Sequence, residues 1–319
     1  MPSAQLGRTV LIANPTSHSG RGAAAADVVS RFFEVYRTST TSFETRTTTA
    51  VGDAFSIASH MDADTLIVLG GDGVIHEAVC GLMQLEPQSR PRLGVIPMGS
   101  GNDYARTIGM SLNKPDDAIA ELLGGSERAI DVGRVTSDAE LGTTYFLETL
   151  SFGLDAAIAI DTTVRRSAGT KQHGSGLFLT SSLKVFSRSH KPYACTVRIN
   201  GDEPFELESL IFAVQNGPTY GGGFRICPTA VPNDGLLDVC YNSRKPNLVH
   251  TLVLLARARF GLHASSPYIH LRTAEQLQID FAGVDVPCQV DGEELSGTSF
   301  DVGVVPQALR VIVPAKCPW

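Results

Sequence analysis

Short apolar runs alternate with amphipathic stretches through the first third of the chain. Four runs rich in β-branched and aliphatic side chains predict strands: residues 8–13, 42–48, 65–69 and 92–96. Three intervening stretches carry apolar positions at helical spacing: residues 23–36, 53–61 and 74–83. Strands separated by helices predict βαβ units in a parallel sheet, which binds ligands at the carboxyl ends of its strands.

After residue 125 the pattern changes to short β-rich runs punctuated by turn residues. Nine of these runs predict strands: residues 129–136, 144–152, 194–200, 207–215, 236–241, 276–281, 288–290, 300–304 and 309–313. Helical inserts are expected near residues 176–187 and 247–260. The fold class is therefore α/β plus β. We predict a doubly wound parallel-sheet nucleotide domain at 1–128 and an antiparallel β-sandwich at 129–319, whose last strands could return toward the first domain.

Composition narrows the functional classes. A length of 319 residues with 43% hydrophobic and 18% charged side chains suits two packed domains. The net charge of −7 argues against binding nucleic acid through its phosphates. Six cysteines without CxxC spacing favour reduced thiols over a zinc site. We expect a cytoplasmic protein that meets membranes peripherally, because the sequence shows neither a leader nor an apolar run of spanning length.

One segment departs from the acidic average. Residues 162–201 contain seven lysines and arginines and no acidic residue, interspersed with apolar side chains from Leu177 to Phe186. This combination suits an anionic membrane surface. Alternatively, the apolar residues pack on the sandwich while the cations remain solvated. The first interpretation predicts that charge reversal at Arg165, Arg166 and Lys171 weakens binding to anionic vesicles.

Three polar, glycine-bearing loops follow predicted strands of the first domain. Residues 70–73 read Gly-Gly-Asp-Gly, residues 97–103 read Pro-Met-Gly-Ser-Gly-Asn-Asp, and residues 14–22 begin Asn-Pro-Thr-Ser. Glycines let the backbone approach a phosphate, and Asp72 could hold Mg²⁺ or its waters. Each loop alone could also be a capped strand-to-helix turn. However, loops that follow neighbouring parallel strands lie at the same edge of the sheet, which favours a shared binding site. A Walker A loop is excluded because the chain contains no Gly-Lys pair.

These loops, with the PMGSGNDYAR run at residues 97–106, resemble the catalytic domain of the diacylglycerol and lipid kinases. The resemblance continues through Asn216-Gly217, the glycines at 221–223, PNDGLLDV at 232–239 and Val-Asp-Gly-Glu at 290–293, and so covers nearly the whole chain. The length and motif order are similar to those of the soluble bacterial diacylglycerol kinases.

The resemblance implies an ATP- and Mg²⁺-dependent enzyme. Its ATP site would be formed by ten residues: Asn14, Pro15, Thr16, Ser17, Thr48, Gly70, Gly71, Asp72, Gly73 and Ser100. Asp72 and Asp131 would position Mg²⁺ through water, and Glu293 would be the general base. Asp234, with main-chain oxygens of Val231 and Leu236, would hold a second, structural Mg²⁺.

Departures from the family pattern affect two of these assignments. His18 and Ser19 stand where the family usually continues directly to glycine, and Thr229 stands where a carboxylate is frequent. The first departure concerns the phosphate contacts of residues 17–20, and the second concerns the structural metal site. Ser100 replaces the commoner threonine but keeps the hydroxyl.

The expected reaction converts diacylglycerol to phosphatidic acid. A lipid hydroxyl keeps its proton at neutral pH, so a carboxylate such as Glu293 must accept that proton during transfer. A kinase of the same fold acting on a sphingoid base, phosphatidylglycerol or NAD is the nearest alternative. A nucleotide-binding regulator without turnover is another, and self-association into a homodimer is left open.

Overall fold

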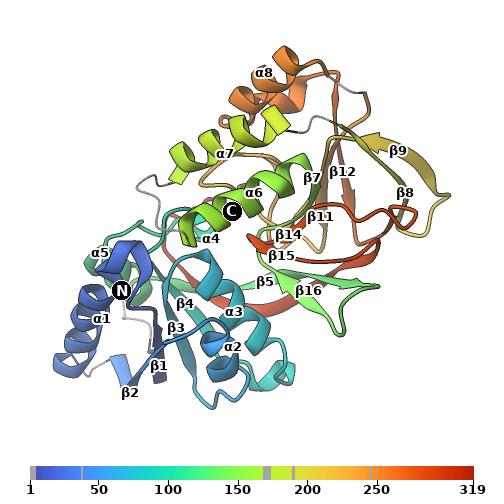
Figure 1. The fold of residues 1–319 in the computed structure, drawn as a ribbon. Coiled ribbons are helices and arrows are strands. Elements are labelled where there is room, and N and C mark those ends of the chain that lie inside the picture. Colours follow the sequence, from blue (N-terminus) through green and yellow to red (C-terminus); the bar gives the residue numbers. More distant parts are fainter. Residues whose placement is uncertain (1–4, 37–38, 168–173, 189–190, 245) are drawn as a thin grey trace. The chain divides into compact units, whose positions relative to one another are not determined.

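The computed structural model describes residues 5–36, 39–167, 174–188, 191–244 and 246–319. The chain divides into two compact units, the first comprising Met1–Ile130 with Gln307–Trp319 and the second Asp131–Pro306. The first unit is built on a parallel sheet and the second on antiparallel sheets, as Figure 1 shows element by element. The predicted fold class is therefore confirmed.

The sheet of the first unit has the strand order β2-β1-β3-β4. Its strands are all parallel: β1 (Gly7–Ala13), β2 (Thr40–Thr47), β3 (Thr65–Gly70) and β4 (Arg92–Pro97). The last part of β16 (Ser299–Val313) pairs in parallel with β4 through Val311 and Leu93. Every residue of β3 is buried, because helices cover both faces of a parallel sheet.

Helices α1 (Ser17–Val35) and α5 (Pro115–Leu123) contact each other on one face of this sheet, and α2 (Asp53–Ala58) and α3 (Asp72–Leu82) on the opposite face (Figure 1). Two shorter helices complete the unit: η2 (Pro87–Ser89) and α4 (Asp103–Ile108). Helix α5 was not predicted. Proline and two aspartates form its first turn, and Gly124 follows its end.

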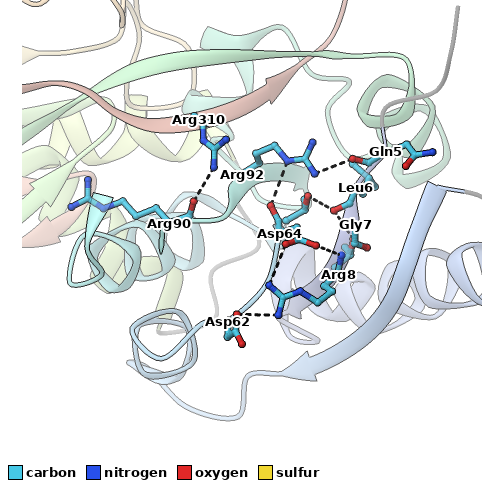
Figure 2. A network of polar contacts seen from close by, with 11 residues as sticks. Gln5, Leu6, Gly7, Arg8, Asp62, Asp64, Arg90, Arg92 and Arg310 are labelled. Carbon is cyan, nitrogen blue, oxygen red and sulfur yellow. Dashed lines mark hydrogen bonds and ion pairs between the residues drawn. The ribbon is translucent and has the colours of Figure 1, made fainter. Parts of the chain in front are cut away.

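A polar network joins the amino ends of the parallel strands (Figure 2). The Arg8 guanidinium donates to Asp62 at 3.0 Å and to Asp64 at 3.2 Å, and Arg92 donates to the Gln5 carbonyl at 2.9 Å. The Arg8 backbone N–H and guanidinium together keep the pKa of Asp64 below its ordinary value. These partly exposed pairs contribute little stability each, and they link residues at the starts of β1, β3 and β4.

The second unit contains two antiparallel sheets. One has the order β12-β11-β10-β7-β14-β15, and the other places the first part of β16 beside β13, β8 and β9, with β5 and β6 paired alongside. Their bounds are β5 (Ser126–Ser137), β6 (Thr144–Phe146), β7 (Thr149–Gly153), β8 (Tyr193–Ile199), β9 (Phe205–Ser209), β10 (Ile211–Gln215), β11 (Leu237–Asn242), β12 (Ile269–Ala274), β13 (Gln276–Asp280), β14 (Cys288–Val290) and β15 (Glu293–Glu294).

Inward-facing side chains from both sheets form one apolar core. The Phe152 ring lies with its centroid 4.8 Å from that of Phe300 and 5.4 Å from that of Phe281. Along β8 and β13, side chains buried in this core alternate with side chains that are exposed or partly exposed. This arrangement is the expected β-sandwich, in which two sheets bury one face each.

Helices α6 (Leu154–Ser167), α7 (Gly174–Arg188) and α8 (Leu248–Ala258), with the short η3 (Leu262–Ser265), cover the outer face of the six-stranded sheet (Figure 1). Asn247 caps α8 by accepting a hydrogen bond from the His250 N–H at 2.9 Å. Within the described ranges, no helix combines the length and apolarity needed to cross a bilayer.

Several element boundaries differ from the prediction. The single strand expected at 144–152 is broken at residues 147 and 148, and the strand expected at 207–215 is two strands that belong to different sheets. The strands expected at 300–304 and 309–313 are one continuous strand, β16. Helix α6 and strand β12 were not predicted, because their apolar residues lack a clean period in the sequence.

Candidate functional site

The glycine loops at residues 70–73 and 97–103, the second and third along the chain, meet at the carboxyl edge of the parallel sheet. The Met98 N–H donates to the Gly70 carbonyl at 2.7 Å, which holds the end of β4 against the end of β3. A Cβ atom on Gly99 would lie 2.5 Å from the Gly71 Cα atom. Only glycine permits this backbone approach.

Asp72 connects the two helices that begin at this edge. It is the first residue of α3 and is partly exposed. Its Oδ1 atom accepts a hydrogen bond from the Tyr104 N–H, at the start of α4, at 3.4 Å. The Asp72 carboxylate therefore lies at the carboxyl ends of β3 and β4, and Ser100 lies in the loop between β4 and α4.

The loop at residues 14–22, the first along the chain, reaches the same edge. The Asn14 N–H donates to the Leu69 carbonyl at 3.0 Å, and the Asn14 side-chain oxygen accepts from the Thr16 N–H and hydroxyl. The Ser17 hydroxyl donates to the Asn14 carbonyl at 2.9 Å. A Cβ atom on Gly22 would lie 2.1 Å from that carbonyl oxygen, so the start of α1 packs directly on the loop.

Residues 18–20, where the sequence departs from the family pattern, form a kink within α1. His18, Ser19 and Gly20 all have positive φ angles of 48°, 58° and 88°. Left-handed backbone costs a non-glycine residue about 1–2 kcal/mol. The His18 Nδ1 atom lies 3.3 Å from the Gly99 carbonyl oxygen, which joins the first loop to the third.

Thr48 lies beside the first loop. Its backbone N–H donates to the Ala13 carbonyl at 2.9 Å, and its side chain is buried. Thus the structure brings together, within the first unit, the loops and the threonine that the sequence assigned to the ATP site.

The second unit holds the other predicted residues. Asp131 is fully buried, its N–H donates to the Pro232 carbonyl at 2.8 Å, and its Oδ2 atom accepts from the Gly235 N–H at 2.7 Å. Asp131 thereby fixes the loop that carries the predicted metal ligands Val231, Asp234 and Leu236. The motifs alone did not indicate this contact, since about a hundred residues separate its two sides.

Asp238 is a neighbour that sequence reasoning gave no role. It is buried, and burial followed by the negative charge of Asp234 raises its pKa to about 6. A bound cation would relieve this repulsion, so the loop suits Mg²⁺ with its carboxylates and main-chain oxygens. In the part of the chain that the structure describes, no three histidine, cysteine or acidic side chains group as metal ligands, so water and main-chain oxygens would complete the shell.

Glu293 lies exposed on a tight hairpin between β14 and β15. Asp291 and Gly292 have φ angles of 49° and 97°, as a two-residue turn with left-handed backbone requires. The Asp291 carboxylate accepts three backbone hydrogen bonds, from Leu147, Glu148 and Thr149, at 2.8 to 3.1 Å. These bonds explain the break between β6 and β7 and hold the backbone that presents Glu293.

An apolar cavity of about 50 Å³ lies between the six-stranded sheet and helices α6 and α8. Its lining is mainly aliphatic and aromatic, with contributions from Ile158, Phe224 and Leu255. One carboxyl group, Asp155, borders it and accepts a hydrogen bond from the Tyr220 hydroxyl at 2.9 Å. Burial raises the pKa of Asp155 to about 7. No local pattern in the sequence indicates this cavity, because its lining comes from segments spread between residues 154 and 269.

Replacing Asp155 with asparagine is expected to flatten the pH dependence of stability. The pKa of Asp155 is raised from 3.8 to about 7 in the folded protein, so wild-type stability is full below about pH 4 and declines as pH rises to about 7. The decline is on the order of 4 kcal/mol, since each pH unit is worth about 1.4 kcal/mol. Chemical denaturation across this range tests the difference between the two proteins. Parallel pH profiles would show that Asp155 is not the responsible group.

The basic segment is partly engaged within the fold. The Arg165 guanidinium donates to the hydroxyls of Thr180 and Ser181 at 2.9 and 3.0 Å, and Lys184 pairs with Asp161. Lys171 and the side chain of Arg166 lie outside the described residues. The predicted role of this segment at a membrane therefore remains a prediction.

Comparison with known families agrees with both units. Residues 8–135 match the diacylglycerol kinase catalytic domain, and residues 148–313 match the YegS C-terminal NAD kinase beta sandwich-like domain. The second match alone covers more than half of the chain. The chain therefore belongs to the family of lipid kinases that combine these two domains, and membership of a kinase family implies use of ATP.

Individual relatives are similar over most of their length. Proteins called "Probable lipid kinase YegS-like" from Yersinia pestis (strain Pestoides F) and Yersinia pseudotuberculosis serotype O:1b (strain IP 31758) are each 28% identical over 268 residues, covering 82% of both chains. A crystal structure of a diacylglycerol kinase from Bacillus anthracis str. Sterne has a TM-score of 0.71 at 18% identity, covering 97% of this chain and 98% of that one. At that identity the structural match shows the shared fold.

Proposed function

We propose that the protein transfers the γ-phosphoryl group of ATP, as its Mg²⁺ complex, to the free hydroxyl of diacylglycerol, giving phosphatidic acid. The observation that carries the choice of a lipid acceptor is the apolar cavity beneath α8. A polar acceptor such as NAD would need many hydrogen-bonding partners, whereas the cavity offers mostly hydrocarbon. At about 50 Å³ it is smaller than an acyl chain, so chain binding requires its walls to move apart.

The ATP end of the reaction is supported by the three loops of the first unit. Backbone N–H groups at the starts of α1, α3 and α4 suit phosphate oxygens, and the glycines let those oxygens approach. Mg²⁺ would neutralise charge on the β- and γ-phosphates when bound. Asp72 would hold it directly or through water, and we propose Asp131 for the same water-mediated role.

Glu293 is proposed to accept the proton of the acceptor hydroxyl. Its exposure and its position on an anchored turn suit a group that must meet substrate. The loop of Val231, Asp234 and Leu236 would hold a structural Mg²⁺ that keeps this region ordered. We propose that the enzyme works at the cytoplasmic surface of a membrane, where its substrate resides.

A panel of acceptors tests the proposal. With radiolabelled ATP and mixed micelles, diacylglycerol is expected to give the highest kcat/KM among monoacylglycerol, phosphatidylglycerol, ceramide, sphingosine and free NAD, and omission of Mg²⁺ should abolish labelling. Preferred labelling of sphingosine, phosphatidylglycerol or NAD would reassign the substrate. Binding of ATP without labelling of any acceptor would favour a regulator.

A further inference from the structure

The outer surface of helix α8 is apolar although it faces solvent. Val249, Val253, Ala256 and Phe260 follow one another at intervals of four, three and four residues, so they form one stripe along the helix and the turn after it. All four are exposed, Val249 by 69%, Val253 by 50% and Phe260 by 70%. Helices of folded proteins normally present charged side chains on this face.

The inner face of the same helix is apolar as well. Leu254, Leu255 and Ala258 line the cavity, and Leu252 packs against the adjacent apolar cluster. Between Leu248 and Ala256 the helix carries no charged residue apart from the titratable His250. An exposed apolar stripe on a helix whose inner face is also apolar is typical of a surface that contacts a membrane or another molecule.

The turn after the helix extends this surface. Leu262 is 57% exposed, and the Arg257 guanidinium donates to the Leu262 carbonyl at 2.7 Å. The buried His263 ring lies 3.0 Å from the Ile226 carbonyl oxygen. The turn that carries Phe260 and Leu262 is therefore held to α8 through Arg257 and to the segment of Ile226 through His263.

The chain segment that carries this surface is cationic. Residues 239–274 contain five lysines and arginines and no acidic residue, in a chain whose net charge is −7. Arg225, Arg244 and Arg257 are exposed. Val164 on α6 and Leu183 on α7 are also exposed and lie in the other acid-free segment, residues 162–201. Helix α7 packs through Val185 on the same apolar cluster as α8.

We propose that the surface formed by Val249, Val253, Phe260 and Leu262, which we term the α8 face, docks on an anionic phospholipid bilayer. Apolar side chains at the boundary of the acyl region, surrounded by cations at headgroup level, are the arrangement that interfacial helices use. A second copy of the chain is disfavoured as occupant, because two such faces would bring like charges together. This inference deepens the proposed function and rests on it, in that docking would place the wall of the cavity against the membrane that holds the lipid acceptor.

Sedimentation with vesicles tests the proposal without ATP or turnover. Wild-type protein is expected to bind vesicles of phosphatidylcholine mixed with phosphatidylglycerol, and the double variant Val249→Glu, Val253→Glu should bind at least about tenfold more weakly. The matched control is Val35→Glu, Val51→Glu, which changes valines that are 72% and 93% exposed in the first unit. The control should bind like wild type, and turnover of a soluble short-chain diacylglycerol should be unchanged in both double variants.

A second measurement keeps the apolar character of the site. The chain has one native tryptophan, so Val253→Trp adds a second reporter whose emission should shift to shorter wavelength with anionic vesicles and be quenched by brominated lipid. Unaltered emission, or wild-type-like sedimentation of the Val249→Glu, Val253→Glu variant, would overturn the proposal. So would light scattering that showed a lipid-free dimer dissociated by those two substitutions. Vesicle binding without phosphorylation of diacylglycerol would instead count against the proposed function alone.

Discussion

Replacing Glu293 with glutamine is expected to lower turnover of diacylglycerol by about 10²–10⁴-fold while leaving ATP affinity unchanged. Glutamine keeps the size of the side chain but cannot accept the hydroxyl proton during transfer, which is what general base catalysis contributes. The Asp291 anchor is untouched, so the hairpin should keep its conformation. Steady-state labelling gives the turnover, and calorimetry with ATP and Mg²⁺ gives the affinity.

Glu294→Gln is the matched control for this experiment. Glu294 is exposed on the same short strand β15 and pairs opposite Gln289, one position further from the turn. Alternate side chains of a strand point to opposite faces, so the control should retain activity. Equal activity of both variants and wild type would remove Glu293 from the mechanism.

Replacing Gly99 with alanine should weaken ATP binding by about tenfold to a hundredfold. The added Cβ atom would lie 2.5 Å from the Gly71 Cα atom and 2.7 Å from the Asn102 side-chain oxygen, so the two loops would have to separate. Overpacking of this kind costs about 1–3 kcal/mol, and here the cost falls on the arrangement that we propose for the phosphates. Calorimetric titration with ATP and Mg²⁺ measures the effect.

Gly124→Ala serves as the comparison, because it lies after α5 and its new Cβ atom would lie no nearer than 3.2 Å to the Ala120 carbonyl oxygen. This variant should bind ATP like wild type. An unchanged dissociation constant in Gly99→Ala, with normal folding by circular dichroism, would mean that ATP does not bind at the approach of Gly71 and Gly99.

The sequence predicted the parallel sheet well because its signals are local. β3 and β4 are continuous apolar runs, and each ends in glycine-bearing residues that mark the edge where ligands bind. The positions of Asn14, Asp72 and Gly99 near one another follow from that rule alone. The kink at His18 and Ser19 could not be foreseen, because left-handed backbone is uncommon for non-glycine residues and the contact of His18 with Gly99 joins residues 81 positions apart.

The second unit was harder to predict because long-range contacts set its boundaries. The break within 144–152 is caused by the carboxylate of Asp291, which takes three backbone N–H groups that a continuous strand would use in its ladder. The turn at Leu210 separates β9 from β10 because the Asn242 side chain accepts from the Leu210 and Ile211 N–H groups, each at 3.0 Å. Asp291 and Asn242 both lie too far along the chain to enter the short stretches of sequence from which hydrophobic periodicity is read.

The strand β16 makes the first unit discontinuous. Residues 307–319 supply it with the pairing of Val311 to Leu93, the ion pair of Lys316 with Glu121 and the hydrogen bond from the Trp319 indole to the Thr107 carbonyl at 3.0 Å. During synthesis the first unit therefore cannot be completed until the whole second unit has been made. Until then the β2–β1–β3–β4 sheet lacks the pairing of Val311 with Leu93, so a chain cut after residue 130 would leave that part of β4 as an exposed edge.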